Sequence, residues 1–507
     1  MDPVGLFGIV ASLGLLIFFA YRGINVIILA PLCALFATLL AGAPLLATYT
    51  EVFMPALGRF AVTYFPLFLL GAIFGKLMDD SGAARRIAGS IVDRIGAQRA
   101  LLAIILSCAI LTYGGVSLFV VAFAVFPIAA ALFREAHVPK RLIPAAIALG
   151  SFTFTMTALP GTPAIQNAIP APYFGTNAFA APGLGTIAGL IMFFGGLFWL
   201  NWRAKRAEAA GEGYDDGPLM SPPDKTGRKT RDTLAAGEAH PDSDTHHGLE
   251  SSPDSDREGA PAPGATAVAT EERGGMPTWL AYVPVFIVIG INWVMVNLVF
   301  PAMDTSYLAE ERYRERTLAD VQGIWGIIVA LIVAILFMLV VHYKRYADTK
   351  KSMNEGTMGS LLPIFNTASE VGYGAVIAAL PAFLIIRDGV LGISENPLIS
   401  TSVAVNVLAG ITGSASGGMS IALEALGADL AAQAQAQGIA MELMHRVTAL
   451  SSGGMDALPH NGAVITLLAV CGLTHRQSYS DIGMVAVVIP VASIITVIIL
   501  GTLFGSF

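Results

Sequence analysis

Two apolar stretches of the chain are each interrupted by a short segment rich in glycine and proline, residues 159–167 (LPGTPAIQN) and 456–462 (DALPHNG). Inside a bilayer such a segment leaves backbone N–H and C=O groups without helical partners, and no water is present to satisfy them. Irregular backbone therefore survives at that depth only where it lines a cavity or is buried in protein. A pair of interrupted helices, one in each half of a chain, indicates the binding site of a secondary transporter.

The composition indicates a polytopic membrane protein. Of the 507 residues, 55% are hydrophobic and only 13% are charged, whereas soluble domains have about 25% charged residues. The first apolar run has no basic segment before it and no good cleavage site after it, so we interpret it as a span rather than a signal peptide. The runs long enough to cross a bilayer lie at 4–20, 24–48, 57–78, 142–158, 183–202, 279–300, 323–342, 361–386, 447–471 and 484–504.

Two further apolar stretches, 101–133 and 398–426, do not fit single crossings. Glycines interrupt the first at 113–115 (YGG) and the second at 412–418 (TGSASGG). We predict that both are re-entrant hairpins, because a hairpin at 101–133 keeps Arg99 and Arg134 on one side, as the positive-inside rule requires. The same rule places the N- and C-termini outside and the hydrophilic stretch 203–278 in the cytoplasm.

The predicted fold is an all-α polytopic membrane protein with two inverted-topology repeats. Each repeat has about five transmembrane helices plus one re-entrant hairpin, with a broken helix at the midplane. Since the number of crossings per repeat is odd, the second repeat is an upside-down copy of the first. Residues 203–278 are rich in Gly, Pro, Ser and acidic residues and are predicted to form a disordered linker. The first repeat is 1–202, with its hairpin at 101–133 and broken helix at 142–175; the second is 279–507, with its hairpin at 398–426 and broken helix at 447–471.

The first break contains signals for restarting a helix. Thr162 is a good N-cap and Pro163 suits a first helical turn, so we expect a helix from residue 164 onward. Such a helix would direct free N–H groups and the positive end of its dipole into the gap, which favours an anion. Gln166 and Asn167 add side-chain donors. A proline kink in a packing helix explains the same residues equally well.

The second break carries ionisable groups. Asp456 and His460 lie about one turn apart, and charged residues at bilayer depth indicate function by default. The carboxylate beside an imidazole could carry a proton, or it could hold Na⁺ together with backbone carbonyls. Glu370, in the apolar run 361–386, is a second candidate for the proton. The structural alternatives are a pair that caps a broken helix and, for Glu370, a buried hydrogen bond.

The predicted hairpin tips hold small residues and hydroxyls. Glycine permits close backbone approach, and the hydroxyls could bond a polyhydroxylated ligand, although tight turns with satisfied side chains are as plausible. We expect no catalytic residue and no cofactor, and no metal motif is present, although bound Na⁺ remains an alternative. The candidate substrate-binding residues are Thr112, Gly114, Gly115, Ser117, Gly161, Thr162, Pro163, Gln166, Asn167, Ser414, Ser416, Gly417, Ser451, Ser452 and Asn461.

The segments around both breaks closely resemble the gluconate permease (GntP) family, which includes gluconate and D-3-hydroxybutyrate permeases and is part of the ion transporter superfamily. The resemblance implies inverted repeats, a homodimer and elevator-like movement of a domain that contains both hairpins. It also implies cation-coupled symport, usually with protons, of a small hydroxylated monocarboxylate across the inner membrane of a bacterium, with no nucleic-acid partner. The matching segments are 157–170 (TALPGTPAIQNAIP), 173–176 (YFGT), 452–465 (SGGMDALPHNGAVI) and 472–476 (GLTHR).

Two other functions stay open on the residues alone. A Na⁺/H⁺ antiporter of the same superfamily would need no organic substrate, and the hydroxyl-rich hairpins argue against it. An intramembrane hydrolase could use Ser451, Asp456 and His460, but such crowded residues seldom form a catalytic triad, which is defined by spatial roles. The sequence does not choose between gluconate, 3-hydroxybutyrate, glycerate and lactate-like acids, nor between H⁺ and Na⁺.

Overall fold

The computed structural model describes residues 3–22, 24–214, 276–459 and 461–507. Within these ranges the chain forms helices joined by turns, and no strand is found there. Most of the predicted linker, 215–275, and the candidate residue His460 lie outside the described residues.

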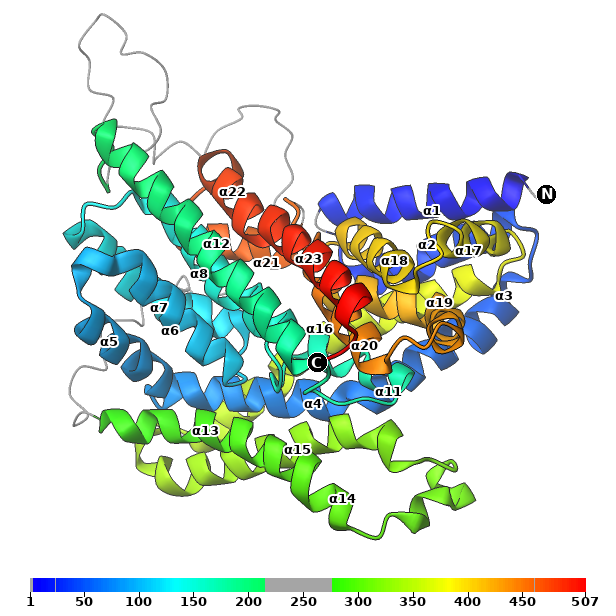
Figure 1. Cartoon of the computed structure of the whole chain (residues 1–507), viewed down its shortest axis with the longest axis horizontal. Coiled ribbons are helices and arrows are strands. Elements are labelled where there is room, and N and C mark those ends of the chain that lie inside the picture. Colours follow the sequence, from blue (N-terminus) through cyan, green and yellow to red (C-terminus); the bar gives the residue numbers. More distant parts are fainter. Residues whose placement is uncertain (1–2, 23, 215–275, 460) are drawn as a thin grey trace, which may run out of the picture. The chain divides into compact units, whose positions relative to one another are not determined.

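The helices before the linker include long spans and several single turns (Figure 1). They are α1 (Pro3–Tyr21), α2 (Val26–Leu40), α3 (Leu45–Thr48), α4 (Met54–Asp80), α5 (Ala83–Ile95), α6 (Ala100–Tyr113), α7 (Leu118–Glu135), α8 (Ile143–Ser151), α9 (Phe154–Thr157), α10 (Ile165–Ala168), α11 (Ala171–Phe174) and α12 (Pro182–Ala209).

The helices after the linker follow a similar mixture of lengths. Single π-helical turns join α3 to α4, α13 to α14 and α22 to α23. The elements are α13 (Thr278–Val294), α14 (Phe300–Ala302), α15 (Leu318–Val341), α16 (Thr349–Ala379), α17 (Phe383–Leu391), α18 (Pro397–Thr412), α19 (Ala415–Ala436), α20 (Met441–Ser452), α21 (Gly462–Cys471), α22 (His475–Gly483) and α23 (Ile489–Phe504).

Five of the described helical segments are long and apolar enough to cross a membrane, and two bent helix pairs raise that number to seven. The five correspond to the predicted runs 57–78, 183–202, 279–300, 323–342 and 484–504. The predicted runs 4–20 and 24–48 coincide with shorter apolar helices, α1 and α2. The prediction of an all-helical polytopic membrane protein is therefore confirmed.

Several boundaries differ from the predicted ones. The run 361–386 is not one span, because α16 ends at Ala379 and the chain bends by 97° into α17. The cause is Pro381, which disfavours the helical conformation of the residue before it; Leu380 is accordingly extended, with φ −77° and ψ 136°. At the linker, α12 continues to Ala209, beyond the predicted boundary at 202.

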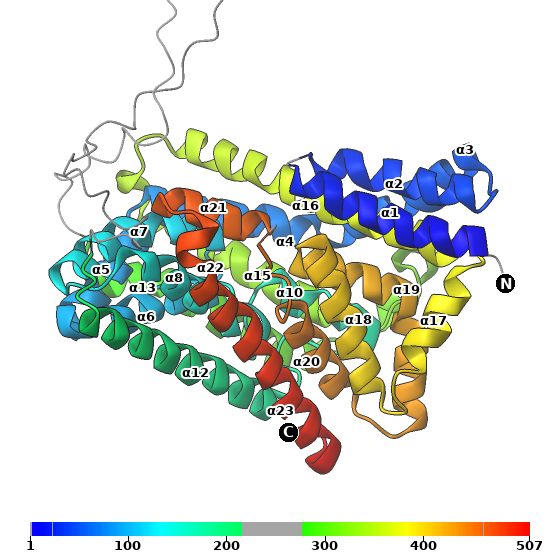
Figure 2. The ribbon, with the colours of Figure 1, turned by 90° about the horizontal axis from the view of Figure 1, so that it is seen from above.

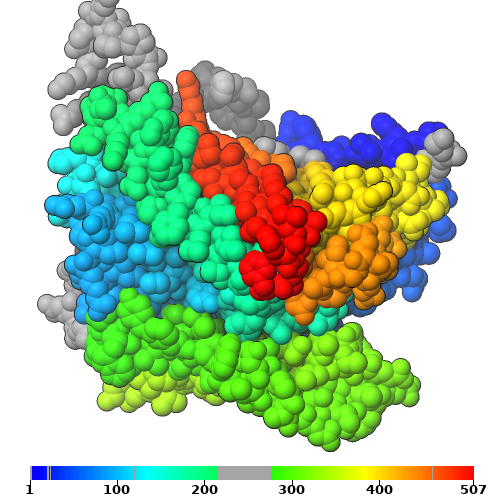
Figure 3. Space-filling view, in the orientation of Figure 1, coloured from blue at the N-terminus to red at the C-terminus, as the bar shows by residue number. Residues whose placement is uncertain are grey.

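The long helices pack in two groups. In the first, α16 lies along α4 and α2, and α15 packs against both α4 and α13 (Figure 2). In the second, α18, α19 and α20 pack together, and α23 runs along α12. The space-filling view shows α23 (red) at the surface between α12 (green) and α18 (yellow) (Figure 3). The α16–α19 contact joins the two groups.

A buried carboxylate ties helices before the linker to helices after it. Asp481 of α22 is fully buried, and its oxygens accept hydrogen bonds from Arg141 (Nη1, 3.0 Å), Arg203 (Nε, 2.7 Å) and Trp199 (Nε1, 3.1 Å). Arg141 also pairs with Glu212, at 2.6 Å. Arg203, just past the predicted boundary at 202, therefore lies inside α12 and bonds Asp481.

Replacing Asp481 by Asn should lower the thermal stability of the purified protein strongly. Removing one partner of a buried ion pair costs about 3–5 kcal/mol, because the remaining charges stay buried. Asp388→Asn is the matched control, since Asp388 is 68% exposed and pairs with Arg387 at the surface, where such pairs contribute about 0–1 kcal/mol. Equal melting temperatures for the two variants would contradict the assigned role of Asp481.

Candidate functional site

The two helix breaks begin side by side. In the first break, α9 ends at Thr157 and the next helical turn, α10, begins only at Ile165; in the second, α20 ends at Ser452 and α21 begins at Gly462. Gly453 opens the second break, and a Cβ on it would lie 2.8 Å from Cγ2 of Thr157. The ends of α9 and α20, one from each half of the chain, therefore meet at one buried place.

The first break does not restart in the predicted way. The N-cap of α10 is Ala164, which is extended (φ −61°, ψ 142°) and has no side chain to cap with, so the prediction of Thr162 as the cap is wrong. The helix ends after one turn, because Pro170 and Pro172 lack the N–H groups that would continue it. A single turn adds little dipole, so the anion site cannot rest on the end of this helix.

Asn167 holds the first break together. Its side chain is fully buried, and Nδ2 donates to the carbonyls of Thr162 (3.1 Å) and Ala178 (2.9 Å). Its Oδ1 accepts from Arg446 Nη1 at 3.1 Å and lies 3.3 Å from His445 Nε2. Since both ends of the amide are used within the protein, Asn167 shapes the site rather than offering free groups to a ligand.

Arg446 of α20 is a site residue that the sequence interpretation missed. Its guanidinium is fully buried and donates to the carbonyls of Ala180 (Nε, 3.0 Å; Nη2, 2.7 Å), Thr157 (Nη1, 3.3 Å) and Ala178 (Nη2, 3.4 Å). Gly185 of α12 leaves room for it, because a Cβ there would lie 3.0 Å from Arg446 Nε. These bonds fix the stretch that leads into the first break to the stretch that leads out of it.

The neighbouring His445 is also fully buried, with Nδ1 2.6 Å from Thr176 Oγ1. The predicted span began at residue 447, which placed both basic residues at the membrane surface. The helix begins at Met441 instead, and this places them among apolar neighbours. The signal was the apolar pattern of 441–450 (MELMHRVTAL), in which two basic residues stand inside a helical run.

The turn between α6 and α7 lies against the first break. Tyr113 Oη donates to the Pro160 carbonyl at 2.6 Å. Gly115 has φ +90°, and a Cβ on it would lie 3.1 Å from Cγ of Pro163. Thr112 is buried, and its Oγ1 has no hydrogen-bond partner within the described ranges. Tyr113 and Gly115 therefore bring this turn to residues 160–163 of the first break, and Thr112 directly precedes Tyr113 in the chain.

The other predicted residues of this turn pack more simply. Gly114 is pressed against α13, where a Cβ would lie 2.6 Å from Cγ1 of Val285. Ser117 begins α7 without a side-chain cap, and its backbone lies near Gly75 of α4. Both positions hold the turn against its neighbours.

Asn461 plays a corresponding part in the second break. Its Nδ2 donates to the carbonyls of Gly413 (2.8 Å) and Asp456 (2.9 Å). Its Oδ1 caps α21 by accepting from the backbone N–H groups of Ala463 (2.6 Å) and Val464 (3.0 Å). The bond from Asn461 back to the carbonyl five residues earlier repeats the bond from Asn167 to Thr162. Gly413 lies in the turn between α18 and α19, so this turn contacts the second break.

The predicted serines before the second break bond within the protein. Ser451 Oγ donates to Ser402 Oγ of α18 at 3.0 Å, and Ser452 Oγ donates to the Ala449 carbonyl at 2.7 Å. Both serines are fully buried. Ser451 thus ties α20 to α18, whereas Ser452 bonds within α20.

Two carboxylates near the second break have an oxygen without a hydrogen-bond partner in the part of the chain that the structure describes. One is Glu370 Oε2 and the other is Asp456 Oδ1. Glu370 is 4% exposed and faces the start of α19, where a Cβ on Gly417 would coincide with its Oε2. Ser414 caps this helix by accepting from Gly417 N at 3.0 Å.

Two further predicted residues are Ser416 and Gln166. Ser416 Oγ, in the first turn of α19, is 3.4 Å from Thr367 Oγ1, one turn before Glu370 on α16. Gln166 in the first break is buried, and its Oε1 has no partner among the described residues. The Asp456–His460 pair stays a prediction, since His460 is not described.

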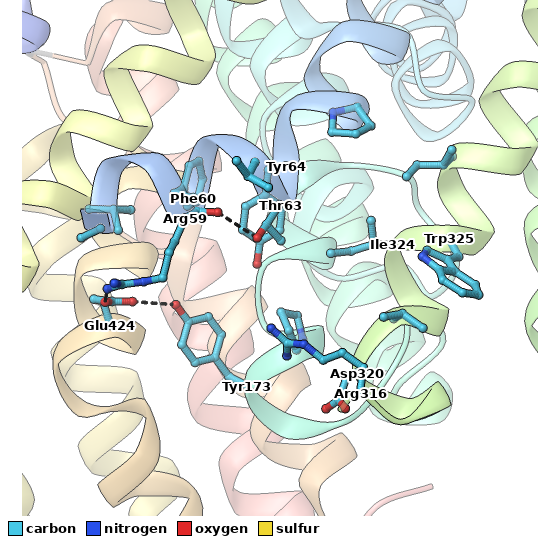
Figure 4. A pocket seen from close by; sticks show the side chains of 17 residues that line it. Arg59, Phe60, Thr63, Tyr64, Tyr173, Arg316, Asp320, Ile324, Trp325 and Glu424 are labelled. Atoms are coloured by element: carbon cyan, nitrogen blue, oxygen red, sulfur yellow. Dashed lines mark hydrogen bonds and ion pairs between the residues drawn. The ribbon is translucent and has the colours of Figure 1, made fainter. Parts of the chain in front are cut away.

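Two cavities flank the chain that follows the first break. One, of about 490 Å³, lies between α4, α11, α15 and α19 (Figure 4). There Glu424 accepts hydrogen bonds from Arg59 Nη2 at 2.9 Å and from Tyr173 Oη at 3.4 Å. Arg316 and Asp320 line the opposite side of the cavity. The other, of about 470 Å³, is lined by residues of the stretch 175–182. None of the predicted site residues lines either cavity, so neither cavity is the predicted site.

Replacing Gly161 by Ala should destabilise the protein and impair uptake. Gly161 has φ +79°, and a Cβ on it would lie 2.5 Å from Cε1 of Phe179. Gly42 has φ +67° with open space around it, so Gly42→Ala carries only the backbone cost of about 1–2 kcal/mol. Melting temperature and uptake should both fall further for Gly161→Ala; identical losses in the two variants would contradict the close packing of the break.

Comparison with known proteins identifies the family of the chain. The model of the GntP family permeases matches residues 4–205. The chain is 43% identical over 504 residues to the uncharacterized transporter YxjC of Bacillus subtilis (strain 168), and the aligned residues cover 98% of each chain. It is 30% identical over 175 residues to the high-affinity gluconate transporter of Escherichia coli (strain K12). The aligned residues cover 33% of this chain and 38% of that transporter. The chain with the two adjoining helix breaks thus belongs to the GntP family of permeases.

Proposed function

We propose that the protein is a secondary active transporter that takes up a small hydroxylated monocarboxylate, such as gluconate or 3-hydroxybutyrate, together with a cation, most simply a proton. The observation that carries the proposal is the contact of Gly453 with Thr157, which joins two interrupted helices in a chain of a permease family. Interrupted helices that meet near the midplane are where secondary transporters hold substrate and coupling ion. The name of the partly matching Escherichia coli relative supports the choice of substrate class.

The substrate is held between the two breaks. Its carboxylate lies near the N–H groups of Gly161–Ala164 in the first break, on the side of the turn that carries Thr112. Its hydroxyls bond Gln166 and, from the other side, Ser416. The oxygens of Thr112 and Gln166 that have no partner in the described chain support this assignment. Asn167, Asn461, Ser451 and Ser452 shape the site from behind.

Asp456 or Glu370 takes the coupled proton, and His460 tunes the affinity of Asp456. Each carboxylate offers an oxygen without a partner in the described chain, which a proton or a Na⁺ ion can occupy. A charged side chain at the centre of the bilayer costs about 2.5–3.5 kcal/mol or more. Protonating the carboxylate before the site crosses the hydrocarbon removes that charge and lowers this free-energy cost. Substrate and cation are therefore carried together.

The transport cycle follows from two inverted repeats that move as an elevator, in a homodimer in the inner membrane with both termini outside. Two helices joined by a short turn precede an interrupted helix in each half of the chain: α6 and α7 in the first half, α18 and α19 in the second. This repeated order supports the repeats. The recurring bond from an asparagine to the carbonyl five residues earlier supports them as well.

Counterflow in proteoliposomes tests the function. Vesicles loaded with unlabelled gluconate, 3-hydroxybutyrate, glycerate or lactate should accumulate the labelled form of at least one of these acids, and an inward proton gradient should drive its uptake. Absence of counterflow for every acid, combined with Na⁺-driven proton movement, would contradict the proposal and indicate the antiporter.

Asp456→Asn or Glu370→Gln should abolish uphill uptake while counterflow continues, because exchange needs no net proton movement. Glu355→Gln is the control on the same helix as Glu370, since Glu355 pairs with Lys76 away from the breaks, and it should keep both activities. The measurement compares gradient-driven accumulation with counterflow for each variant. Accumulation at the wild-type level in both site variants would remove these carboxylates from coupling.

A further inference from the structure

We propose that Arg446 supplies the fixed positive charge that makes the site prefer an anion over a neutral ligand of the same shape. This inference rests on the proposed function and specifies how its site recognises a carboxylate. Arg446 acts as a positioning residue that does not touch the substrate. It holds the first break in place and attracts the substrate carboxylate by its charge.

The first argument is charge balance. Arg446 is fully buried in α20, and among the residues that the structure describes it forms no ion pair with a carboxylate. A buried charge without a counter-ion is costly, and the burial of charges in proteins is ordinarily accompanied by pairing. The other well-buried arginine cluster follows that rule, because Arg141 and Arg203 share Asp481.

The second argument is the use of the donors. A guanidinium has five N–H groups, and Arg446 makes five hydrogen bonds, to the carbonyls of Thr157, Ala178 and Ala180 and to Asn167 Oδ1. No donor is left for a ligand. The bonds satisfy the polar hydrogens, but their acceptors are neutral groups, so the net positive charge persists.

The third argument is the distance from the proposed carboxylate position. Asn167 accepts from Arg446 and donates to the carbonyl of Thr162, so the guanidinium lies two hydrogen bonds from the first break. At a separation of about 7–10 Å and an effective dielectric constant of about 20, opposite unit charges attract strongly enough to change affinity by about 10- to 50-fold. The charge of Arg446 therefore favours one negative charge at the first break.

A purely structural clamp would make a different prediction. If Arg446 served only to tie residues 157, 178 and 180 together, its replacement would lower stability and weaken every ligand alike. A charge-selecting residue changes the ratio between a carboxylate and its neutral amide. That ratio separates the two roles even in a destabilised protein.

The experiment measures the affinities of gluconate and gluconamide, and of 3-hydroxybutyrate and 3-hydroxybutyramide, for purified protein by ligand-induced thermal shift. The wild type should bind the better acid at least about 10-fold more tightly than its amide, as the Coulomb argument requires. Arg446→Lys, which keeps the charge, should retain this preference, and Arg446→Gln should lose it. Arg203→Gln is the control, because it removes the same charge from an arginine that pairs with Asp481, and it should leave the ratio unchanged.

A folded Arg446→Gln protein that keeps the wild-type ratio would overturn the inference. Should neither Arg446 variant fold, the wild type still decides, since equal affinities for acid and amide would overturn the inference and a 10-fold or greater preference would support it. Wild-type protein that binds neither the acids nor the amides would instead overturn the proposed function, and the inference with it.

Discussion

Backbone that leaves a helix inside a bilayer must find its hydrogen bonds in other protein groups, because neither lipid nor bulk water supplies them. The site is built to meet this requirement. Tyr113 and Asn167 satisfy carbonyls of the first break, Asn461 satisfies carbonyls of the second break and of the adjacent turn, and Arg446 binds three carbonyls around the first break. Each unwound segment is thereby held open in one conformation.

The same requirement links the fold to the proposed transport. The side chains that satisfy the breaks come from α6, α10 and α20 and from the start of α21, which are far apart in the sequence. These segments must therefore stay together while a site between the breaks is exposed first on one side and then on the other. Glu370 reaches the start of α19 from α16, so the proposed proton carrier lies where the two helix groups meet.

Much of the fold was predictable, because the bilayer sets the length of apolar runs and because glycine and proline mark interruptions. The sequence therefore located α4, α12, α13, α15 and α23 and both breaks. It misplaced the end of α16, although Pro381 carried the signal, and it chose Thr162 as a cap where the prolines that follow prevent a sustained helix. Arg446 was missed because the predicted span began at 447, although the helix begins at Met441. Its partners at 157, 178 and 180 are moreover brought to it only by tertiary packing.

The central claim is that the two breaks meet, and cysteine cross-linking in native membranes tests it most directly. A Cβ on Gly453 would lie 3.6 Å from Cβ of Thr157, within the range of about 3.5–4.5 Å found in disulfides. After the native cysteines Cys33, Cys108 and Cys471 are replaced, the double variant Thr157→Cys, Gly453→Cys should form an intramolecular disulfide under mild oxidation. Two thiols that both stay free and open to alkylation under those conditions would show that the breaks lie apart, and would contradict the account.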